Sequence, residues 1–447
     1  MLPGMGNAVF GGPRHHATRC AAVALAATAW SASAVAAGGF IPQHSEYLRP
    51  ALTQKSGAVA ATLEFAAFGR DFRLRLSSNQ RLARFATDSS LKLYAGTLEG
   101  APGSWVRISV LDDLPRGMIW DGHELFIVDA APQGVNYGSA GTVMYKLSDA
   151  VMERGVSFVG DTVEPARDTS TAYADVIDGI RARNQALQNG VATQAVEISV
   201  LGDADFVARF SSAAQARDAI LARLNNVDGI FSSQVGVELQ VVTVDVEGDI
   251  TGSLSDTTDS NELLDELGQL RRRLPALSTT GLTHLFTGRS LDGDTAGVAY
   301  ELALCSPRFA AGLTEAHSSA TLDSLITAHE IGHIFGAPHD GDGDCLSTPV
   351  GQHIMTPTLT TAVTSFSQCS LDQINEVRDS YSCLVTLTPP APGPPPPAPP
   401  APPPSDGDGD DNGGGGALDP LLLALLLALR FMRQRRQSPV PMAARAS

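Results

Sequence analysis

Residues 329–340 hold the feature that most constrains this chain, the run H-E-I-G-H-I-F-G-A-P-H-D. His329 and His333 are four residues apart, so on a helix both side chains project from the same face, one turn apart. Gly336 can adopt the backbone conformation that ends a helix, which brings His339 round as a third imidazole. We expect these three histidines to bind one zinc ion and to leave its fourth position open for chemistry.

Glu330 lies beside these histidines and is not needed as a ligand. Its carboxylate is placed to reach a water molecule at the open position, which predicts a general base. Leu322, Leu325 and Ile326 form an apolar stripe just before the motif, and this stripe predicts a buried helix. The alternative is a surface helix with scattered histidines. Burial argues against it, because three buried imidazoles would need partners.

The spacing H-E-x-x-H-x-x-G-x-x-H resembles the metzincin signature of zinc endopeptidases. Asp340, directly after the third histidine, is similar to the adamalysin (reprolysin, ADAM) group, and no tyrosine follows Met355 as it would in an astacin. In residues 352–357 the resemblance implies that Met355 forms the methionine turn beneath the metal; taken alone, Met355 would be an ordinary core methionine. The resemblance covers about residues 195–385. It implies a metzincin sandwich with one catalytic zinc ion and with protein or peptide substrates.

Residues 282–289 and 297–300 are similar to the edge-strand region of adamalysins, where a peptide substrate pairs with the sheet. His284 is expected to be a strand residue without a metal role, because three zinc ligands are already assigned. Adamalysins often bind a structural calcium ion as well. Glu197 corresponds to one calcium ligand, but Gly281 stands where the family usually has aspartate, so we do not assign calcium.

Cys20 lies in the N-terminal targeting segment, and the other four cysteines all lie in the zinc domain. An even number of cysteines in an exported chain predicts disulfides, and the sequence alone allows three pairings. Free thiols or a second metal site are the alternatives. Resemblance to adamalysins favours Cys305 with Cys383 and Cys345 with Cys369.

Residues 1–36 are predicted to be a signal peptide. Arg14 and Arg19 precede the apolar run 21–30, and residues 34–36 supply small side chains for cleavage. The remaining segments are expected to be a mainly β propeptide over 37–160, a linker over 161–193, the zinc domain over 194–387, a Pro-rich and Asp/Gly-rich linker over 388–416 and a hydrophobic, basic tail over 417–447.

The linker at 388–416 cannot pack a core, because its first half is mostly proline and should form an extended spacer. Its Asp-Gly run, 406–412, is expected to be solvated. A solvated linker is favoured over a calcium loop, because Ala417 stands where an EF-hand needs glutamate.

The tail at 417–447 follows four glycines, 413–416, and combines the short apolar run 421–429 with a cluster of arginines. It resembles the GlyGly-CTERM sorting tail of Gram-negative bacteria. That resemblance implies transient membrane contact, cleavage, and delivery to the medium or the outer cell surface, with the arginines held in the cytoplasm. A permanent weak anchor is the alternative, since the apolar run is shorter than a bilayer span.

Alternating apolar and polar residues from 61 to 145 predict antiparallel β-structure with one solvated face. Phe72, Leu74 and Leu76 alternate with arginines, and residues 105–110 alternate in the same way. Residues 63–72 are similar to the start of a reprolysin-type propeptide, which usually uses a cysteine near the zinc to keep the enzyme latent. No cysteine occurs between Ala37 and Leu304, so inhibition by this region must use another group or steric cover.

The zinc domain is predicted to begin with alternating strands and helices. The strands span 196–201 and 237–244, and the helices span 212–227 and 261–274, the second capped by Ser260. Ser370 and Gln373 form a capping box for a closing helix. This alternation predicts an α/β sandwich with a largely parallel sheet.

The length of 447 residues allows two domains plus tails, and the formal net charge of −17 argues against nucleic-acid partners. We expect a monomer. The combined interpretation is an exported zinc-dependent endopeptidase and zymogen. One alternative is an inactive, surface-displayed binding or adhesion module, which would not need Glu330. Another is an enzyme acting on a non-peptide substrate.

Overall fold

The computed structural model describes residues 39–54, 60–86, 91–131, 141–152, 156–158, 161–163 and 192–387. All of the described residues belong to one compact unit, which ends at Pro389. The expected signal peptide, the Pro-rich and Asp/Gly-rich linker and the C-terminal tail therefore lie outside the described residues. No helix of the described residues is long and apolar enough to cross a membrane.

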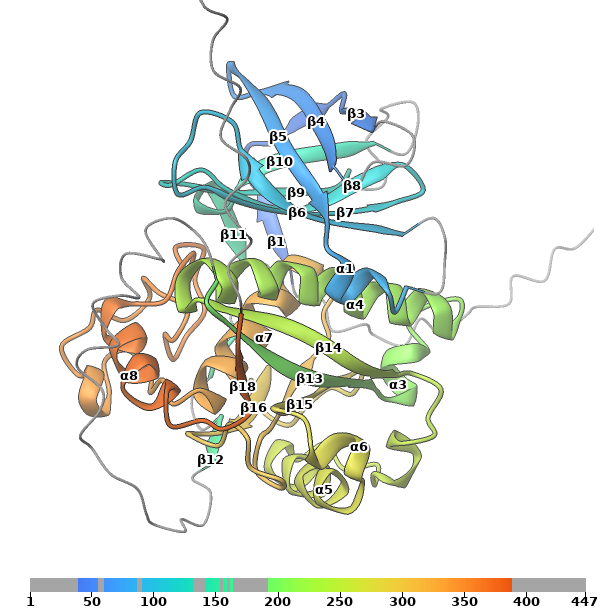
Figure 1. The fold of residues 1–447 in the computed structure, drawn as a ribbon, viewed down its shortest axis with the longest axis vertical. Coiled ribbons are helices and arrows are strands. Elements are labelled where there is room, and N and C mark those ends of the chain that lie inside the picture. Colours follow the sequence, from blue (N-terminus) through green and yellow to red (C-terminus); the bar gives the residue numbers. More distant parts are fainter. Residues whose placement is uncertain are drawn as a thin grey trace, which may run out of the picture. The chain divides into compact units, whose positions relative to one another are not determined.

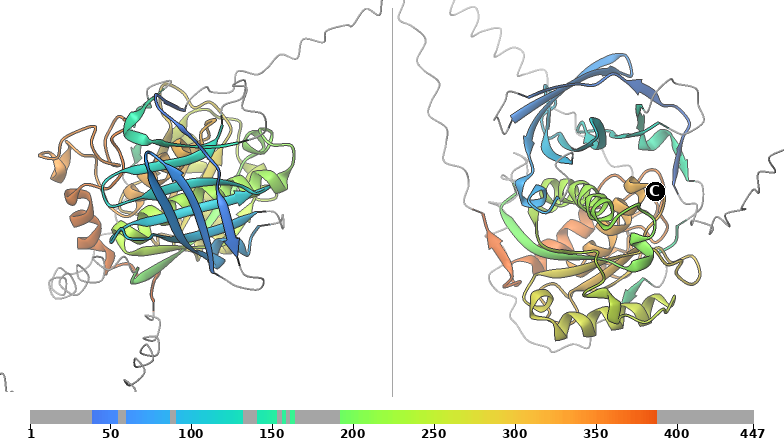
Figure 2. Two further views of the ribbon diagram at one scale, coloured as in Figure 1. Left: turned by 90° about the horizontal axis from the view of Figure 1, so that it is seen from above. Right: turned by 90° about the vertical axis from the view of Figure 1, so that its right-hand side faces the viewer.

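The N-terminal half of this unit is a nine-stranded antiparallel sheet with the strand order β2-β10-β9-β8-β7-β6-β5-β4-β3. Its strands are β2 (Glu46–Leu48), β3 (Ala51–Gln54), β4 (Ala60–Ala67), β5 (Arg70–Ser78), β6 (Lys92–Leu98), β7 (Trp105–Leu111), β8 (Leu114–Trp120), β9 (Leu125–Ala130) and β10 (Thr142–Lys146). β2 contacts β4 although they lie near opposite edges, so the sheet curls around its own apolar core (Figure 2). A second pair, β1 (Phe40–Pro42) and β11 (Ala150–Met152), and the short helix α1 (Gln80–Ala83) complete this half.

Alternation along β5 has the predicted consequence, because Phe72, Leu74 and Leu76 are buried while the arginines between them are exposed. The prediction of one solvated face is wrong for β7. Trp105 and Arg107 are buried there, because this face of the sheet packs against helix α4 (Ala213–Ile230) of the other half. Alternation reports which residues share a face, and it does not report what covers that face.

Charged side chains join β7 and α1 to α4. Arg107 donates to Asp228 Oδ2 from Nε and Nη2 at 3.0 and 2.9 Å, and Arg81 Nη2 donates to the same oxygen at 3.0 Å. Asp228 is fully buried, and these arginines hold the pKa of its carboxyl below its usual value despite the opposing effect of burial. A Cβ on Gly229 would lie 2.7 Å from the Trp105 ring, so a glycine is needed where the sheet meets the helix. The two halves are therefore docked by a buried, specific contact.

The C-terminal half contains a second sheet with the order β12-β16-β17-β15-β13-β14, and β18 pairs with β13. Its strands are β12 (Thr162–Val163), β13 (Gln194–Gly202), β14 (Val237–Asp245), β15 (Leu282–Thr287), β16 (Gly297–Tyr300), β17 (Ala311–Glu315) and β18 (Leu384–Thr386). β14, β13, β15 and β17 are mutually parallel, whereas β16 runs antiparallel to β17 and β18 antiparallel to β13. The prediction of a largely parallel sheet is confirmed.

Helices cover both faces of this sheet (Figure 1). They are α3 (Ala204–Val207), α4, α5 (Ser260–Arg273), α6 (Pro275–Ser278), α7 (Ala320–Ile334) and α8 (Gln368–Arg378). The apolar side chains of α4 and α7 share one core with β13 and β14, while those of α5 and α6 pack on the opposite face of the sheet. This arrangement is an α/β sandwich, and it buries α7 from Thr321 to Ile334.

Two predicted helix caps are wrong by a few residues. Asp259, and not Ser260, caps α5, because its carboxylate accepts hydrogen bonds from the first free N–H groups, those of Asn261 and Glu262. Ser367, and not Ser370, caps α8, since its hydroxyl accepts from the N–H of Ser370. A serine inside the first turn looks like a cap in sequence.

The boundary expected before residue 161 also differs from the structure. Asp161 is completely buried, and β12 pairs with β16 in parallel register, so residues 161–163 are part of the folded unit. Residues 164–191 lie outside the described residues. The polar composition that indicates a linker therefore begins after β12.

Two disulfides are present, Cys305–Cys383 and Cys345–Cys369, with Cα–Cα distances of 5.6 and 5.7 Å. These are the pairs that the resemblance to adamalysins favours. The first joins the chain after β16 to the segment before β18, and the second joins the loop after Asp340 to α8.

Candidate metal centre and active site

Helix α7 carries the first two histidines of the motif. Ser319 caps the helix by accepting a hydrogen bond from Leu322, and the apolar stripe that follows packs into the core shared with α4. His329 and His333 lie one turn apart and are both fully buried. Gly336 has φ +99°, a left-handed conformation that a residue with a side chain rarely adopts, and it redirects the chain after the helix. This turn brings His339 back to the other two imidazoles.

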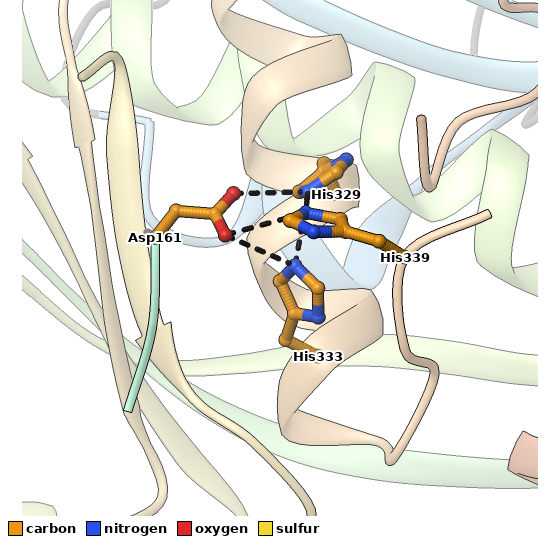
Figure 3. Close-up of side chains that lie close together, drawn as sticks. All are labelled: Asp161, His329, His333 and His339. Carbon is orange, nitrogen blue, oxygen red and sulfur yellow. Dashed lines mark hydrogen bonds and ion pairs between the residues drawn. The ribbon is translucent and has the colours of Figure 1, made fainter. Parts of the chain in front are cut away.

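The three histidines meet a fourth side chain, Asp161 (Figure 3). The Nε2 atoms of His333 and His339 lie 3.0 and 3.2 Å from Nε2 of His329. Oxygens of Asp161 lie 3.1 Å from Nε2 of His329, 3.3 Å from that of His339 and 3.7 Å from that of His333. Within the described residues, these four side chains form the group of histidine, cysteine or acidic residues that could hold a metal ion.

These separations fit a tetrahedral zinc site. Four ligand atoms about 2.0 to 2.1 Å from zinc would lie roughly 3.3 Å apart, close to the separations in this cluster. The imidazoles are also oriented as ligands. His329 Nδ1 donates to the carbonyl of Ile354 at 2.6 Å, and His333 Nδ1 donates to the carbonyl of Ala337 at 2.8 Å. Since a carbonyl only accepts, the ring protons are on Nδ1 and the Nε2 lone pairs face one another.

Two acceptor nitrogens facing each other cannot hydrogen bond, so a cation between them is the natural partner. Burial lowers the pKa of His329 to about 4, which keeps this imidazole neutral and able to coordinate. Three imidazole nitrogens and one carboxylate are a ligand set that zinc accepts.

Glu330 lies beside this cluster, against strand β16. It is fully buried, and neither carboxylate oxygen has a hydrogen-bond partner among the described residues. A Cβ on Gly297 would lie 2.5 Å from Glu330 Oε1, so the glycine leaves room for the carboxylate next to the edge strand. Burial and the charge of Asp161 raise the pKa of Glu330 well above its usual value. An unpaired carboxylate at this position can exchange a proton with a bound reactant.

Met355 and Asp340 fix the segments that carry the histidines through packing and hydrogen bonds. The Met355 side chain is buried against α7, where a Cβ on Gly332 would lie 2.6 Å from its sulfur. The carbonyl of Met355 accepts from the N–H of Asp340 at 2.8 Å. Asp340 Oδ1 in turn accepts from the Ser367 hydroxyl at 2.7 Å. These bonds tie the chain around His339 to Met355 and to α8.

His284 lies apart from the metal cluster. It is a buried residue of β15 whose Nε2 is 2.9 Å from the Thr314 hydroxyl, and burial lowers its pKa to about 3. It is therefore a neutral core histidine, in line with the expectation from sequence. Asp161 is the residue that sequence reasoning missed. Just before it, the apolar Val156 and Phe158 alternate with the polar Ser157, and this alternation is a sequence signal for a buried strand.

Comparison with known proteins finds similarity to metallopeptidases. A family model described as metallo-peptidase family M12, of the reprolysin type, matches residues 192–367. Snake venom metalloproteinase TM-1 of Protobothrops mucrosquamatus is 32% identical over 136 residues, which cover 30% of this chain and 62% of that protein. A disintegrin and metalloproteinase with thrombospondin motifs 14 of Homo sapiens is 23% identical over 392 residues, which cover 77% of this chain and 31% of that protein.

The chain thus spans less than two thirds of the length of these relatives, 62% and 31% respectively. The family match begins just before β13 and includes all three histidines, Glu330 and Met355. Residues 192–367 are therefore similar to the metallo-peptidases of family M12, and both relatives are metalloproteinases.

Proposed function

We propose that this protein is a secreted, zinc-dependent endopeptidase in which His329, His333 and His339 hold zinc and Glu330 is the general base. The observation that carries the proposal is the unpaired, buried carboxylate of Glu330 beside three imidazoles whose Nε2 atoms converge. Zinc bound there would supply a Lewis acid that polarises the scissile carbonyl and a water molecule. Glu330 would accept the proton of that water and pass it to the leaving amine.

The edge of the sheet supports a peptide as the substrate. Strand β16 lies next to Glu330, and in this structure its outer edge pairs with the extended segment β12. An edge strand that accepts one extended segment of backbone can accept another, and strand addition of this kind is a common way to bind peptides. Peptide or protein substrates fit this edge better than a small non-peptide substrate.

Metal removal tests the proposal. We expect the purified protein, freed of any block on its active site, to hydrolyse casein, to lose this activity in a chelator and to regain it with zinc. His333→Gln should lose both zinc and activity, because three ligands hold a catalytic zinc and one would be gone. His284→Gln is the matched control, since it makes the same change at a buried histidine outside the cluster. Zinc content and casein hydrolysis are the measurements.

Three results would count against an endopeptidase. Casein hydrolysis that survives the chelator would exclude zinc catalysis. Zinc binding without hydrolysis of casein or gelatin by any form would favour an inactive binding module on the same fold. Equal loss of zinc in His333→Gln and His284→Gln would refute the ligand assignment.

Export and a removable C-terminal tail form the second part of the proposal. The motivation is the sequence alone: a predicted signal peptide over 1–36, and four glycines followed by a short apolar run and arginines. We place the mature protein, a monomer without nucleic-acid partners, in the medium or on the outer surface of a Gram-negative bacterium. Its intact mass should correspond to an end within or near 413–416. A mass that includes 421–447 would make the tail a permanent anchor instead.

A further inference from the structure

We propose that Asp161 closes the metal site of the full chain by supplying the fourth zinc ligand, and so keeps the enzyme latent. The inference rests on the proposed function, because it concerns the same zinc ion and the same cleft. Three histidines leave one position open for a water molecule, and a carboxylate in that position excludes the water that Glu330 would activate. Latency would then need no cysteine.

The contacts of the carboxylate carry this inference. Asp161 has no exposed surface. Each of the three Nε2 atoms lies within 3.7 Å of one of its two carboxylate oxygens. Oδ1 accepts no hydrogen bond from any described residue, although it is buried. A buried carboxylate oxygen is costly to leave unpaired, so Oδ1, which faces Nε2 of His333 and of His339, indicates a shared cation.

The backbone around Asp161 holds the carboxylate in this position from two sides. On one side, its carbonyl accepts from the N–H of Ala299 at 2.9 Å, and the carbonyl of Val163 accepts from Glu301 at 3.1 Å. On the other side, the N–H of Phe158 donates to the carbonyl of Pro357 at 2.9 Å, just beyond the methionine turn. The segment that contains Asp161 therefore bridges the active site between the edge strand and the methionine turn.

Phe158 adds a contact to a zinc ligand itself. Its ring stacks on the imidazole of His329 with centroids 3.9 Å apart and an interplanar angle of 13°, and the ring is completely buried. The stack covers one face of the metal cluster, while Asp161 faces the ligand nitrogens. The same segment thus blocks the fourth ligand position and occupies the edge of β16 that a peptide substrate would use.

The docking of the N-terminal sheet strengthens the block. Arg107 and Arg81 bind the buried Asp228 on α4, so the sheet that precedes Asp161 in the chain is anchored on the zinc domain. A ligand tethered in this way acts at a high effective concentration, so a single carboxylate can exclude water from the metal. Release of the segment, and not a change in the histidines, would open the site.

Cobalt spectroscopy tests the ligand assignment directly. The full chain is loaded with Co²⁺, whose visible absorption reports the identity and number of ligands, and is titrated with acetohydroxamate, a small metal-binding probe. In the unaltered chain, Asp161 should compete with the probe. Asp161→Ala should shift the absorption bands. It should also bind the probe at least about tenfold more tightly, because the probe no longer has to displace the carboxylate from the metal.

Matched variants distinguish an effect of the Asp161 carboxylate from an effect on the fold. Thr162→Ala changes the next residue of the same segment and should behave as the unaltered chain. Asp161→Asn keeps the size of the side chain and should shift the bands in the same direction as Asp161→Ala. Phe158→Ala keeps the carboxylate but removes the stack on His329, and should weaken the competition with the probe by a smaller factor.

Identical bands and identical titrations for Asp161→Ala and the unaltered chain would overturn the proposal. Loss of cobalt from Asp161→Ala would overturn it as well, because an inhibitory ligand is not needed to retain the metal. Casein hydrolysis by the zinc forms separates this proposal from the proposed function. Altered bands with no hydrolysis by any variant would support the ligand and refute the endopeptidase. Altered bands with equal hydrolysis by all variants would keep the ligand assignment and refute latency alone.

Discussion

Glu330→Gln should reduce peptide hydrolysis by roughly 10²- to 10⁴-fold while the zinc content stays unchanged, since this is the usual contribution of a general base. The amide has nearly the same size as the carboxylate but cannot accept a proton. The change adds no steric conflict at Gly297, against which the side chain lies. It also leaves His329, His333 and His339 intact as ligands. The effect should appear in kcat, measured on an active form of the enzyme.

Glu315→Gln is the matched control for this variant. Glu315 is also buried, and one of its oxygens accepts from the N–H of Leu291 at 2.8 Å, a bond that an amide oxygen can keep. Its activity should stay near that of the unaltered enzyme. A Glu330→Gln enzyme with nearly full activity and full zinc would show that another group accepts the proton. Loss of zinc from Glu330→Gln would show that Glu330 is a ligand.

The two disulfides should differ in what their removal costs. In the chain-entropy description, a bridge over a sequence separation of 78 residues contributes about 4.5 kcal/mol and one over 24 residues about 3.5 kcal/mol. Replacing Cys305 and Cys383 by serine should therefore lower the free energy of unfolding more than replacing Cys345 and Cys369. Denaturant unfolding of the two double variants measures this difference.

Zinc retention should follow the opposite order. Cys345–Cys369 ties the loop after His339 to α8, whose cap Ser367 holds Asp340. Removing this bridge should free the loop and speed the loss of zinc to a chelator, whereas the other bridge does not join this loop. Each double variant is the control for the other. If both release zinc at the same rate, the loop is held by its hydrogen bonds alone.

The spacing of residues along the sequence was sufficient to predict much of the fold of this protein. The positions of His329, His333 and Gly336 follow from the period of a helix and from the conformational freedom of glycine. The structure confirms a buried motif helix, a largely parallel sheet and a mainly β N-terminal half. Each of these features depends on residues a few positions apart, and that is the range over which apolar periodicity and turn residues carry information.

Contacts between segments that are far apart in the sequence could not be predicted from local spacing. Arg107 is buried because β7 meets Asp228 of α4, 121 residues later, and alternation within a strand cannot identify that partner. Asp161 meets His329 across 168 residues, although its surroundings in sequence look like the start of a linker. The sequence alone predicted the chemistry of the motif helix. Only the tertiary structure decided which group lies opposite the three histidines, because the pairing of β12 with β16 places the Asp161 carboxylate there.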